Sequence, residues 1–230
     1  MLENNQSLRV ASDNPLILLL IGIFIVLAAI NVAIMDLFHG LTMEGYSYIA
    51  DTISNLAAGK GSTILDISIQ VFSISIALLS FGLWRLGQLT NDVKWTYSLA
   101  CVLLIVIAVV INFIAAYDAY FNDVDSTALT IHRWLTYALY SCFAAVTFLM
   151  ASKFDEYSKI WGKYSRITGA LWLVSAPIFM FMPTHMDGLY ERFVATQLIL
   201  WIMVSAVMLI MIGVKSGARE KLRNLYLRAG

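Results

Sequence analysis

Long apolar runs alternate with short polar segments along almost the whole chain. A helix needs about 20 predominantly apolar residues to cross the hydrocarbon core of a bilayer. The runs that approach this length are residues 15–38, 63–86, 95–119, 129–151, 166–182 and 190–214. The fifth run is the shortest and contains Pro177, which is expected to kink its helix. The pattern predicts an all-α fold, a bundle of six transmembrane helices in which residues 1–230 form a single membrane domain.

The composition agrees with a membrane protein. The chain is 60% hydrophobic and 13% charged, whereas a soluble domain carries about 25% charged residues. The formal net charge is zero, so nothing favours nucleic acid as a partner, and membrane lipid is the expected one. Cys101 and Cys142 both lie inside apolar runs, which argues against a disulfide framework.

The basic residues are distributed unequally between the two sides of the predicted bundle. Twelve of them fall on the side of both termini: Arg9, Arg85, Lys94, Lys153, Lys159, Lys163, Arg166, Lys215, Arg219, Lys221, Arg223 and Arg228. The other side has Lys60, Arg133 and Arg192. Cytoplasmic loops carry the excess of Lys and Arg. We therefore expect a multi-pass protein of the cell (cytoplasmic) membrane with its N- and C-termini in the cytoplasm.

Charged and amide side chains inside a bilayer are costly, so their positions are informative. Apart from Arg85 and Arg166 at the inner ends of their runs, they fall in the halves predicted to face outward. Those that lie within the runs are Asn31, Asp36, Asp66, Gln70, Asn112, Asp118 and Gln197. Residues at helix ends contact headgroups and water, where polarity is ordinary. Several of these residues lie a turn or more inside the runs, however, which favours a polar pocket that opens to the extracytoplasmic side.

The polar residues of the second run have a regular spacing. Asp66, Gln70 and Ser73 are separated by four and three residues, which places them on one face of a helix. We expect this face to point into the bundle. The alternative face, with Val71, Phe72 and Ile76, is then expected to contact lipid.

Residues 40–62, which we call loop one, have their own pattern. Apolar and polar residues alternate with a helical period between residues 47 and 56, with Ile49, Ile53 and Leu56 on one face and Ser47, Asp51, Ser54 and Asn55 on the other. This predicts a short amphipathic helix in the first outer loop. Such a helix either covers the pocket or lies at the membrane interface.

Several residues at the outer helix ends have side chains suited to catalysis. Asp51, Ser54, His132 and His185 are the candidates for general acid/base chemistry on a headgroup ester. His39, His132 and His185 are candidate metal ligands, and zinc is the metal that three imidazoles suit. No HExxH spacing links these histidines, and the alternative is three separate interfacial histidines.

The charged residues that open the fourth and sixth runs suggest another role. We expect Glu191 and Arg192 to hold the outer helix ends together through ion pairs, with Arg133 or an acid of loop one as the partner. A headgroup phosphate bound by Arg133 or Arg192 is an alternative use of the same charges.

Three segments resemble the membrane family called domain of unknown function 998 (DUF998). They are Tyr46-Ser-Tyr-Ile-Ala-Asp-Thr-Ile-Ser-Asn-Leu56, then Thr130-Ile-His-Arg-Trp134, then Gly188-Leu-Tyr-Glu-Arg192 followed by Trp201. Their order and spacing cover nearly the whole chain. The family often has a Phe-Pro-x-Asp-like turn after the third span, and this chain departs from it, because it reads Ala116-Tyr-Asp-Ala-Tyr120. The family is in turn distantly similar to the eukaryotic Frag1/DRAM/Sfk1 proteins, some of them tied to remodelling of lipid anchors.

These observations support a protein that binds or modifies a lipid headgroup, with or without enzymatic activity. One alternative is an ion- or proton-coupled carrier. The only charged residues in the inner halves of the spans are Arg85 and Arg166 at the span ends, however, and no inverted repeat is visible. A second alternative is a non-catalytic membrane assembly subunit, whose charges only pair with one another.

The charge bias gives a direct prediction of topology. A reporter fused after Gly230 should read as cytoplasmic, and one inserted between Ser126 and Thr127 should read as extracytoplasmic, because twelve basic residues lie on the side of the termini. Paired alkaline phosphatase and fluorescent protein fusions measure this. An extracytoplasmic C-terminus would reverse the predicted orientation.

Overall fold

The computed structural model describes residues 15–57, 63–88, 94–116 and 127–229, with side chains up to Gly217 in the last helix. These residues are almost entirely helical. The elements are α1 (Pro15–Thr42), α2 (Ile53–Ala57), α3 (Thr63–Gln88), α4 (Trp95–Ala116), α5 (Thr127–Tyr157), α6 (Lys159–Phe179), the 3₁₀ helix η2 (Thr184–Met186) and α7 (Asp187–Ala229). The predicted all-α class is confirmed.

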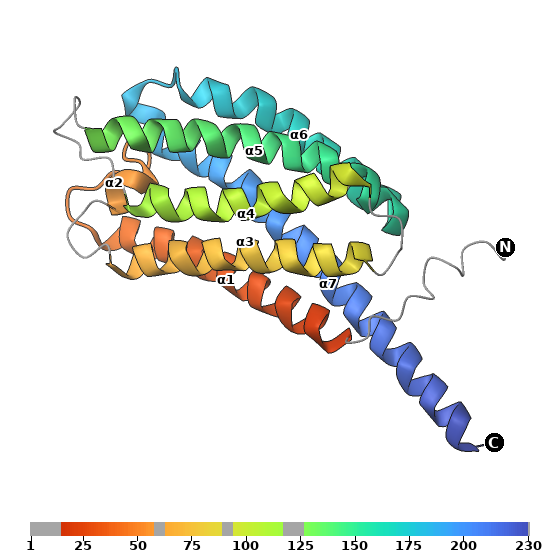
Figure 1. The fold of residues 1–230 in the computed structure, drawn as a ribbon. Coiled ribbons are helices and arrows are strands. Elements are labelled where there is room, and N and C mark those ends of the chain that lie inside the picture. The colour runs from red at the N-terminus through yellow and green to blue at the C-terminus, as the bar shows by residue number, and fades with distance from the viewer. Residues whose placement is uncertain (1–14, 58–62, 89–93, 117–126, 230) are drawn as a thin grey trace.

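The long helices lie side by side in one bundle (Figure 1). In this bundle α1 packs between α3 and α7, and α3, α4, α5 and α6 follow as successive neighbours. The short helix α2 lies at the end of the bundle where α5 and α7 begin, which we call the α2 end. Both α5 and α7 begin at this end. The helix α6, which lies between them in the sequence, therefore runs back toward the α2 end. At the opposite end α7 extends beyond the other helices.

Five segments of the described chain are long and apolar enough to cross a membrane. These are α1, α3, α4 through Ala115, α5, and the segment Thr184–Gly217 of η2 and α7. The sixth predicted span, residues 166–182, corresponds to α6, which begins earlier and ends earlier than expected. Lys159, Lys163 and Arg166 lie in its first two turns and lower its apolar character. Arg166 forms a two-pronged ion pair with Asp155 of α5 at 3.0 Å, which holds this polar start of α6 against the bundle.

Buried serines join neighbouring helices. Ser73 and Ser80 of α3 donate hydrogen bonds of 2.7 Å to carbonyls of α4, and Ser165 of α6 donates one of 2.6 Å to a carbonyl of α5. Small polar side chains allow helices in a membrane to approach closely and to bond across the interface. Serine in these spans therefore supplies interhelical contacts.

The buried face of α3 differs from the predicted one. Gln70 is exposed, whereas Phe72 and Ile76, which we expected at the lipid surface, are 4% and 0% exposed. The prediction is confirmed for Ser73, which is 3% exposed, and wrong for Gln70, Phe72 and Ile76. It oriented the helix by its most polar residues. Leu65, Phe72 and Leu79 repeat every seven residues on the face that packs against α1 and α4, and Gln70 lies beyond the edge of this face.

Loop one forms a shorter helix than its pattern indicates. Only Ile53–Ala57 are α-helical, and Ile49 is 55% exposed while Leu56 is buried. The single amphipathic helix over residues 47–56 is therefore not confirmed. The carbonyls of Tyr48 and Asp51, which a continuous helix would use internally, accept hydrogen bonds from Arg192 of α7 instead.

Glycine sets the distance between α1 and α7. A Cβ atom on Gly22 would lie 2.6 Å from Ile210 Cγ1 and 2.8 Å from the carbonyl oxygen of Ala206. The second neighbour is backbone and cannot rotate away, so only glycine permits this approach.

We predict that Gly22→Ala lowers the free energy of unfolding by about 1–3 kcal/mol, because the two helices must separate to admit the methyl group. Gly217→Ala is the matched control, since a Cβ there has no neighbour nearer than 3.9 Å. Alanine is also the better helix former, so the control should be neutral or slightly stabilised. The midpoint of thermal denaturation in detergent measures both. Equal midpoints for the two variants would contradict the close approach.

Candidate functional site

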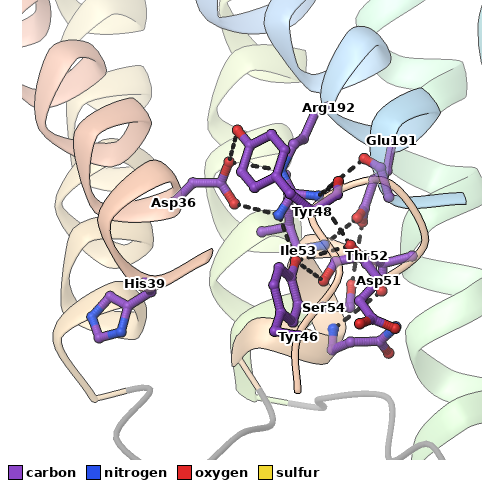
Figure 2. A network of polar contacts seen from close by, with 12 residues as sticks. Asp36, His39, Tyr46, Tyr48, Asp51, Thr52, Ile53, Ser54, Glu191 and Arg192 are labelled. Atoms are coloured by element: carbon purple, nitrogen blue, oxygen red, sulfur yellow. Dashed lines mark hydrogen bonds and ion pairs between the residues drawn. The ribbon is translucent and has the colours of Figure 1, made fainter. Parts of the chain in front are cut away.

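Arg192 is the central residue of the α2 end. It lies in the second turn of α7 and is 7% exposed. Its Nε donates to Asp36 Oδ2 at 2.9 Å, and its Nη2 donates to Asp36 Oδ1 at 2.8 Å. This two-pronged geometry matches the planar guanidinium to the carboxylate. The pair joins α1 to α7, both of them apolar helices (Figure 2).

The remaining donors of Arg192 bind loop one and the first turn of α7. Nη1 donates to the carbonyls of Tyr48, Asp51 and Gly188 at 3.0–3.1 Å, and Nη2 donates to the hydroxyl of Tyr46 at 2.5 Å. The ring of Tyr48 lies 3.8 Å from the guanidinium carbon, within cation–π range. Every nitrogen of Arg192 is thus engaged inside the protein, which leaves none for a headgroup phosphate.

The prediction that Arg192 forms an ion pair between outer helix ends is confirmed, but the predicted partner was wrong. The acid is Asp36 of the first span, whereas Arg133 is exposed on α5. The spacing along the chain could not reveal this pair, because 156 residues separate the two side chains.

Two tyrosines complete the attachment of loop one. Tyr48 donates to Asp36 Oδ2 at 3.0 Å, and Tyr46 donates to the carbonyls of Asp51 and Thr52 at 2.9 Å. Burial raises the pKa of Tyr46 to about 12, and burial raises the pKa of Tyr48 as well. Both phenols therefore stay protonated and keep their donor role at physiological pH.

Gly188 brings α7 into contact with loop one. Its N–H donates to the carbonyl of Ala50 at 3.2 Å, and the N–H of Leu189 donates to that of Ile49 at 2.9 Å. These bonds satisfy amides of the first turn of α7, which have no partner inside the helix. A Cβ atom on Gly188 would lie 2.1 Å from the carbonyl oxygen of Asp51. Only glycine fits here.

Glu191, beside Arg192 in the sequence, binds the other half of loop one. Its Oε2 accepts a hydrogen bond from the N–H of Ile53, at the start of α2. Its Oε1 accepts one from the hydroxyl of Ser54 at 3.4 Å. The two adjacent charges of α7 therefore hold both halves of loop one, Arg192 through residues 46–51 and Glu191 through α2 (Figure 2).

Ser54 also contacts a histidine. Its Oγ lies 3.2 Å from Nε2 of His132, which projects from the second turn of α5. Serine, histidine and glutamate thus meet from α2, α5 and α7. Of the four residues expected to act in catalysis, the structure brings Ser54 and His132 together.

A cavity of about 180 Å³ adjoins these three side chains. Ser54, His132 and Glu191 line it together with Thr136 and Tyr140. The rest of its wall is mainly apolar: Val32, Ile53, Ala57, Ile69, Phe72, Ile111, Ile114, Ala115, Leu139, Trp172, Val194, Ala195, Leu198 and Ile199. The residues of this wall include no Lys or Arg. The cavity is therefore apolar with a small polar end.

The other predicted site residues lie elsewhere. The Asp51 carboxylate accepts a hydrogen bond of 2.7 Å from the N–H of Ser47, so it stabilises the turn of loop one. His185 is exposed on η2, and His39 points away from the Arg192 network in Figure 2. In the described ranges, no group of three or more His, Cys, Asp or Glu is arranged to hold a metal ion. The proposed zinc ligands His39, His132 and His185 therefore do not form a set.

Polar residues deeper in the spans make local contacts. Asn112 is exposed but donates to Ser73 Oγ at 3.2 Å, and Gln197 donates to Ser175 Oγ at 2.9 Å. Asp66 is partly buried. Asp118 lies outside the described residues. Asn112 and Gln197 thus stabilise separate helix contacts. The side chains that meet at the cavity, Ser54, His132 and Glu191, come from loop one and from the outer helix ends.

The five long apolar helices, packed in one bundle with a polar cluster at one end, define a multi-pass helical membrane protein. The model of the family described as protein of unknown function (DUF998) matches residues 19–208, and the chain belongs to this family. No curated protein and no solved structure matches the chain. The family resemblance noted in three sequence segments is confirmed, and these segments supply Arg192, Glu191, Ser54 and His132 to the site.

We predict that Asp36→Ala lowers the free energy of unfolding by about 3–5 kcal/mol, because it leaves the buried guanidinium of Arg192 without its counter-ion. The double variant Asp36→Leu/Arg192→Met should be less destabilised than Asp36→Ala, since it removes both charges. Asp155→Ala, whose partner Arg166 is 46% exposed, is the control for an ion pair near solvent and should cost less. Thermal denaturation in detergent compares the three. A double variant less stable than Asp36→Ala would contradict the role of the unpaired charge.

Proposed function

We propose that this protein crosses the membrane six times and binds one membrane amphiphile of neutral or cationic headgroup at its extracytoplasmic side. The observation that carries the proposal is the cavity itself. Its wall is apolar, and Ser54, His132 and Glu191 form one polar end beside loop one. Pockets that bind small molecules share this combination of apolar walls and a few converging polar groups.

The six-span topology is supported by the course of the chain. The helices α5 and α7 both begin at the α2 end, so α6 must return the chain between them, and it packs along α5 and against α7. The basic residues at the start of α6 can extend past the hydrocarbon region, where long side chains reach the headgroups. The whole of α6, 21 residues with Pro177 in its last turn, is then long enough to cross.

The orientation is supported by the basic residues of the opposite end. Lys153, Lys159, Lys163 and Arg166 cluster at the junction of α5 and α6, and Lys215 lies near the end of the apolar segment Thr184–Gly217. The positive-inside rule places this end in the cytoplasm. The α2 end, with the cavity, then faces outward.

The charges around the cavity favour a particular occupant. Glu191 is the carboxylate of the wall, and the wall has no Lys or Arg to neutralise an anionic group. Arg192 is not part of the wall, and Asp36 and loop one engage its donors. A phosphate monoester would find no basic side chain here, whereas a hydroxyl or ammonium headgroup would meet hydrogen-bond acceptors.

The packing of the core beyond the cavity favours binding in a pocket over transport through the bundle. Trp172 of the wall packs against Phe143 with ring centroids 4.5 Å apart, and Phe143 packs against Trp201 at 5.7 Å. Phe154 stacks on Trp201 from the other end of the bundle at 5.8 Å. A carrier needs a polar path, whereas these aromatic side chains are buried in the core of the described bundle.

We predict that Ala195→Leu removes bound lipid from the purified protein, because the added carbons occupy the cavity. Ala170→Leu is the matched control, since Ala170 is exposed on α6 and outside the cavity wall. Mass spectrometry of lipid co-purified in detergent, per mole of protein, should show about a tenfold loss for the first variant and none for the second. Equal lipid content in wild type and Ala195→Leu would contradict the proposal.

A further inference from the structure

The contacts of Ser54 have a chemical consequence that reaches beyond lipid binding. Its hydroxyl lies at hydrogen-bond distance from two groups that can accept a proton, Nε2 of His132 at 3.2 Å and Oε1 of Glu191 at 3.4 Å. A serine beside a histidine base is the arrangement that activates a hydroxyl as a nucleophile. This serine also faces the apolar cavity, where an acyl chain fits.

From this geometry we infer that the protein is a serine hydrolase of membrane carboxylic esters, with Ser54 as the nucleophile and His132 as the general base. The inference rests on the proposed function, because the bound amphiphile is the substrate. The ester carbonyl lies at the polar end of the cavity, the acyl chain extends along the apolar wall, and the alcohol portion lies toward loop one.

The reaction follows from the two side chains and water. The Ser54 oxygen attacks the ester carbonyl carbon and forms the new C–O bond, while the hydroxyl proton passes to His132 Nε2. The bond to the alcohol portion breaks, and the departing oxygen takes the proton from Nε2. A water molecule then attacks the acyl-serine, gives a proton to His132 and releases the carboxylic acid. The Ser54 oxygen regains that proton, so ester and water yield acid and alcohol.

Glu191 has two functions in this arrangement. Through Oε2 it accepts the hydrogen bond from the N–H of Ile53, so it fixes the start of α2 and with it the position of Ser54. Because His132 and Glu191 both lie next to the same oxygen, positive charge that develops on the imidazole lies close to a carboxylate. A nearby opposite charge stabilises the charged imidazole.

The size of the cavity indicates which part of a substrate it holds. An apolar cavity of roughly 150 Å³ accommodates a benzene-sized group, and this cavity measures about 180 Å³. It therefore holds the part of one acyl chain nearest the carbonyl, while the rest of the lipid remains outside. The substrate class is an acyl ester whose alcohol portion is neutral or cationic, as the absence of Lys and Arg from the wall requires.

The test uses the purified full chain in detergent and a long-chain alkyl fluorophosphonate, which forms a bond to an activated serine oxygen and expels fluoride. We expect labelling at Ser54, located by peptide mass spectrometry. Ser54→Ala should lose this label, and His132→Gln should slow labelling by about 10²–10⁴-fold, the usual contribution of a general base. Release of p-nitrophenol from acyl p-nitrophenyl esters should change in parallel.

Ser47→Ala is the matched control. Its hydroxyl is exposed on the same loop and lies outside the cavity wall, so its labelling rate should equal that of the wild type. Thermal denaturation of each variant separates loss of chemistry from loss of fold, and Ser54→Cys keeps a nucleophile at the position if Ser54→Ala fails to fold.

The outcomes separate the two proposals. Absence of label at Ser54 in the folded wild type, or unchanged labelling in folded His132→Gln, overturns the hydrolase inference. If the wild type then still retains lipid that Ala195→Leu loses, the binding function stands without catalysis. If the lipid difference is also absent, both proposals are wrong.

Discussion

A buried guanidinium organises the α2 end of this protein. A buried guanidinium must be paired and hydrogen-bonded, because an isolated buried charge is costly. Arg192 meets this requirement with the carboxylate of Asp36, three backbone carbonyls and the hydroxyl of Tyr46. The acceptors come from α1, loop one and α7, so none of the three segments can move without leaving part of the charge unpaired.

The rest of the site depends on this constraint. With the carbonyls of Tyr48 and Asp51 taken by Arg192, loop one turns instead of continuing as a helix, and α2 starts only at Ile53. Its first amide then meets Glu191, and Ser54 comes to lie between Glu191 and His132. The pair of side chains that we assign to chemistry is thus positioned by Arg192, which takes no part in it, and by Glu191.

The packing of the spans follows a different rule, in which small residues decide how close helices lie. Gly22 lets α1 contact the backbone of α7, and buried serines bond across from α3 to α4 and from α6 to α5. Lipid tails are as apolar as leucine, so burial alone does not favour one helix neighbour over another. Shape and hydrogen bonds supply that preference, and they leave the cavity where α2, α5 and α7 converge.

The apolar runs by themselves determined the helical class and the positions of the long helices, because the bilayer requires about 20 apolar residues in any crossing helix. The composition of loop one and of the segment around Glu191 also marked where polar chemistry lies, since charged groups near a membrane must be compensated. Which acid compensates Arg192, and which base meets Ser54, was decided only by the tertiary structure. The pairs Asp36–Arg192 and Ser54–His132 are separated by 156 and 78 residues. Sequence periodicity describes one helix at a time, and for Gln70 it pointed to the wrong face. The partners of a residue from another helix depend on how whole helices pack, which a local pattern does not contain.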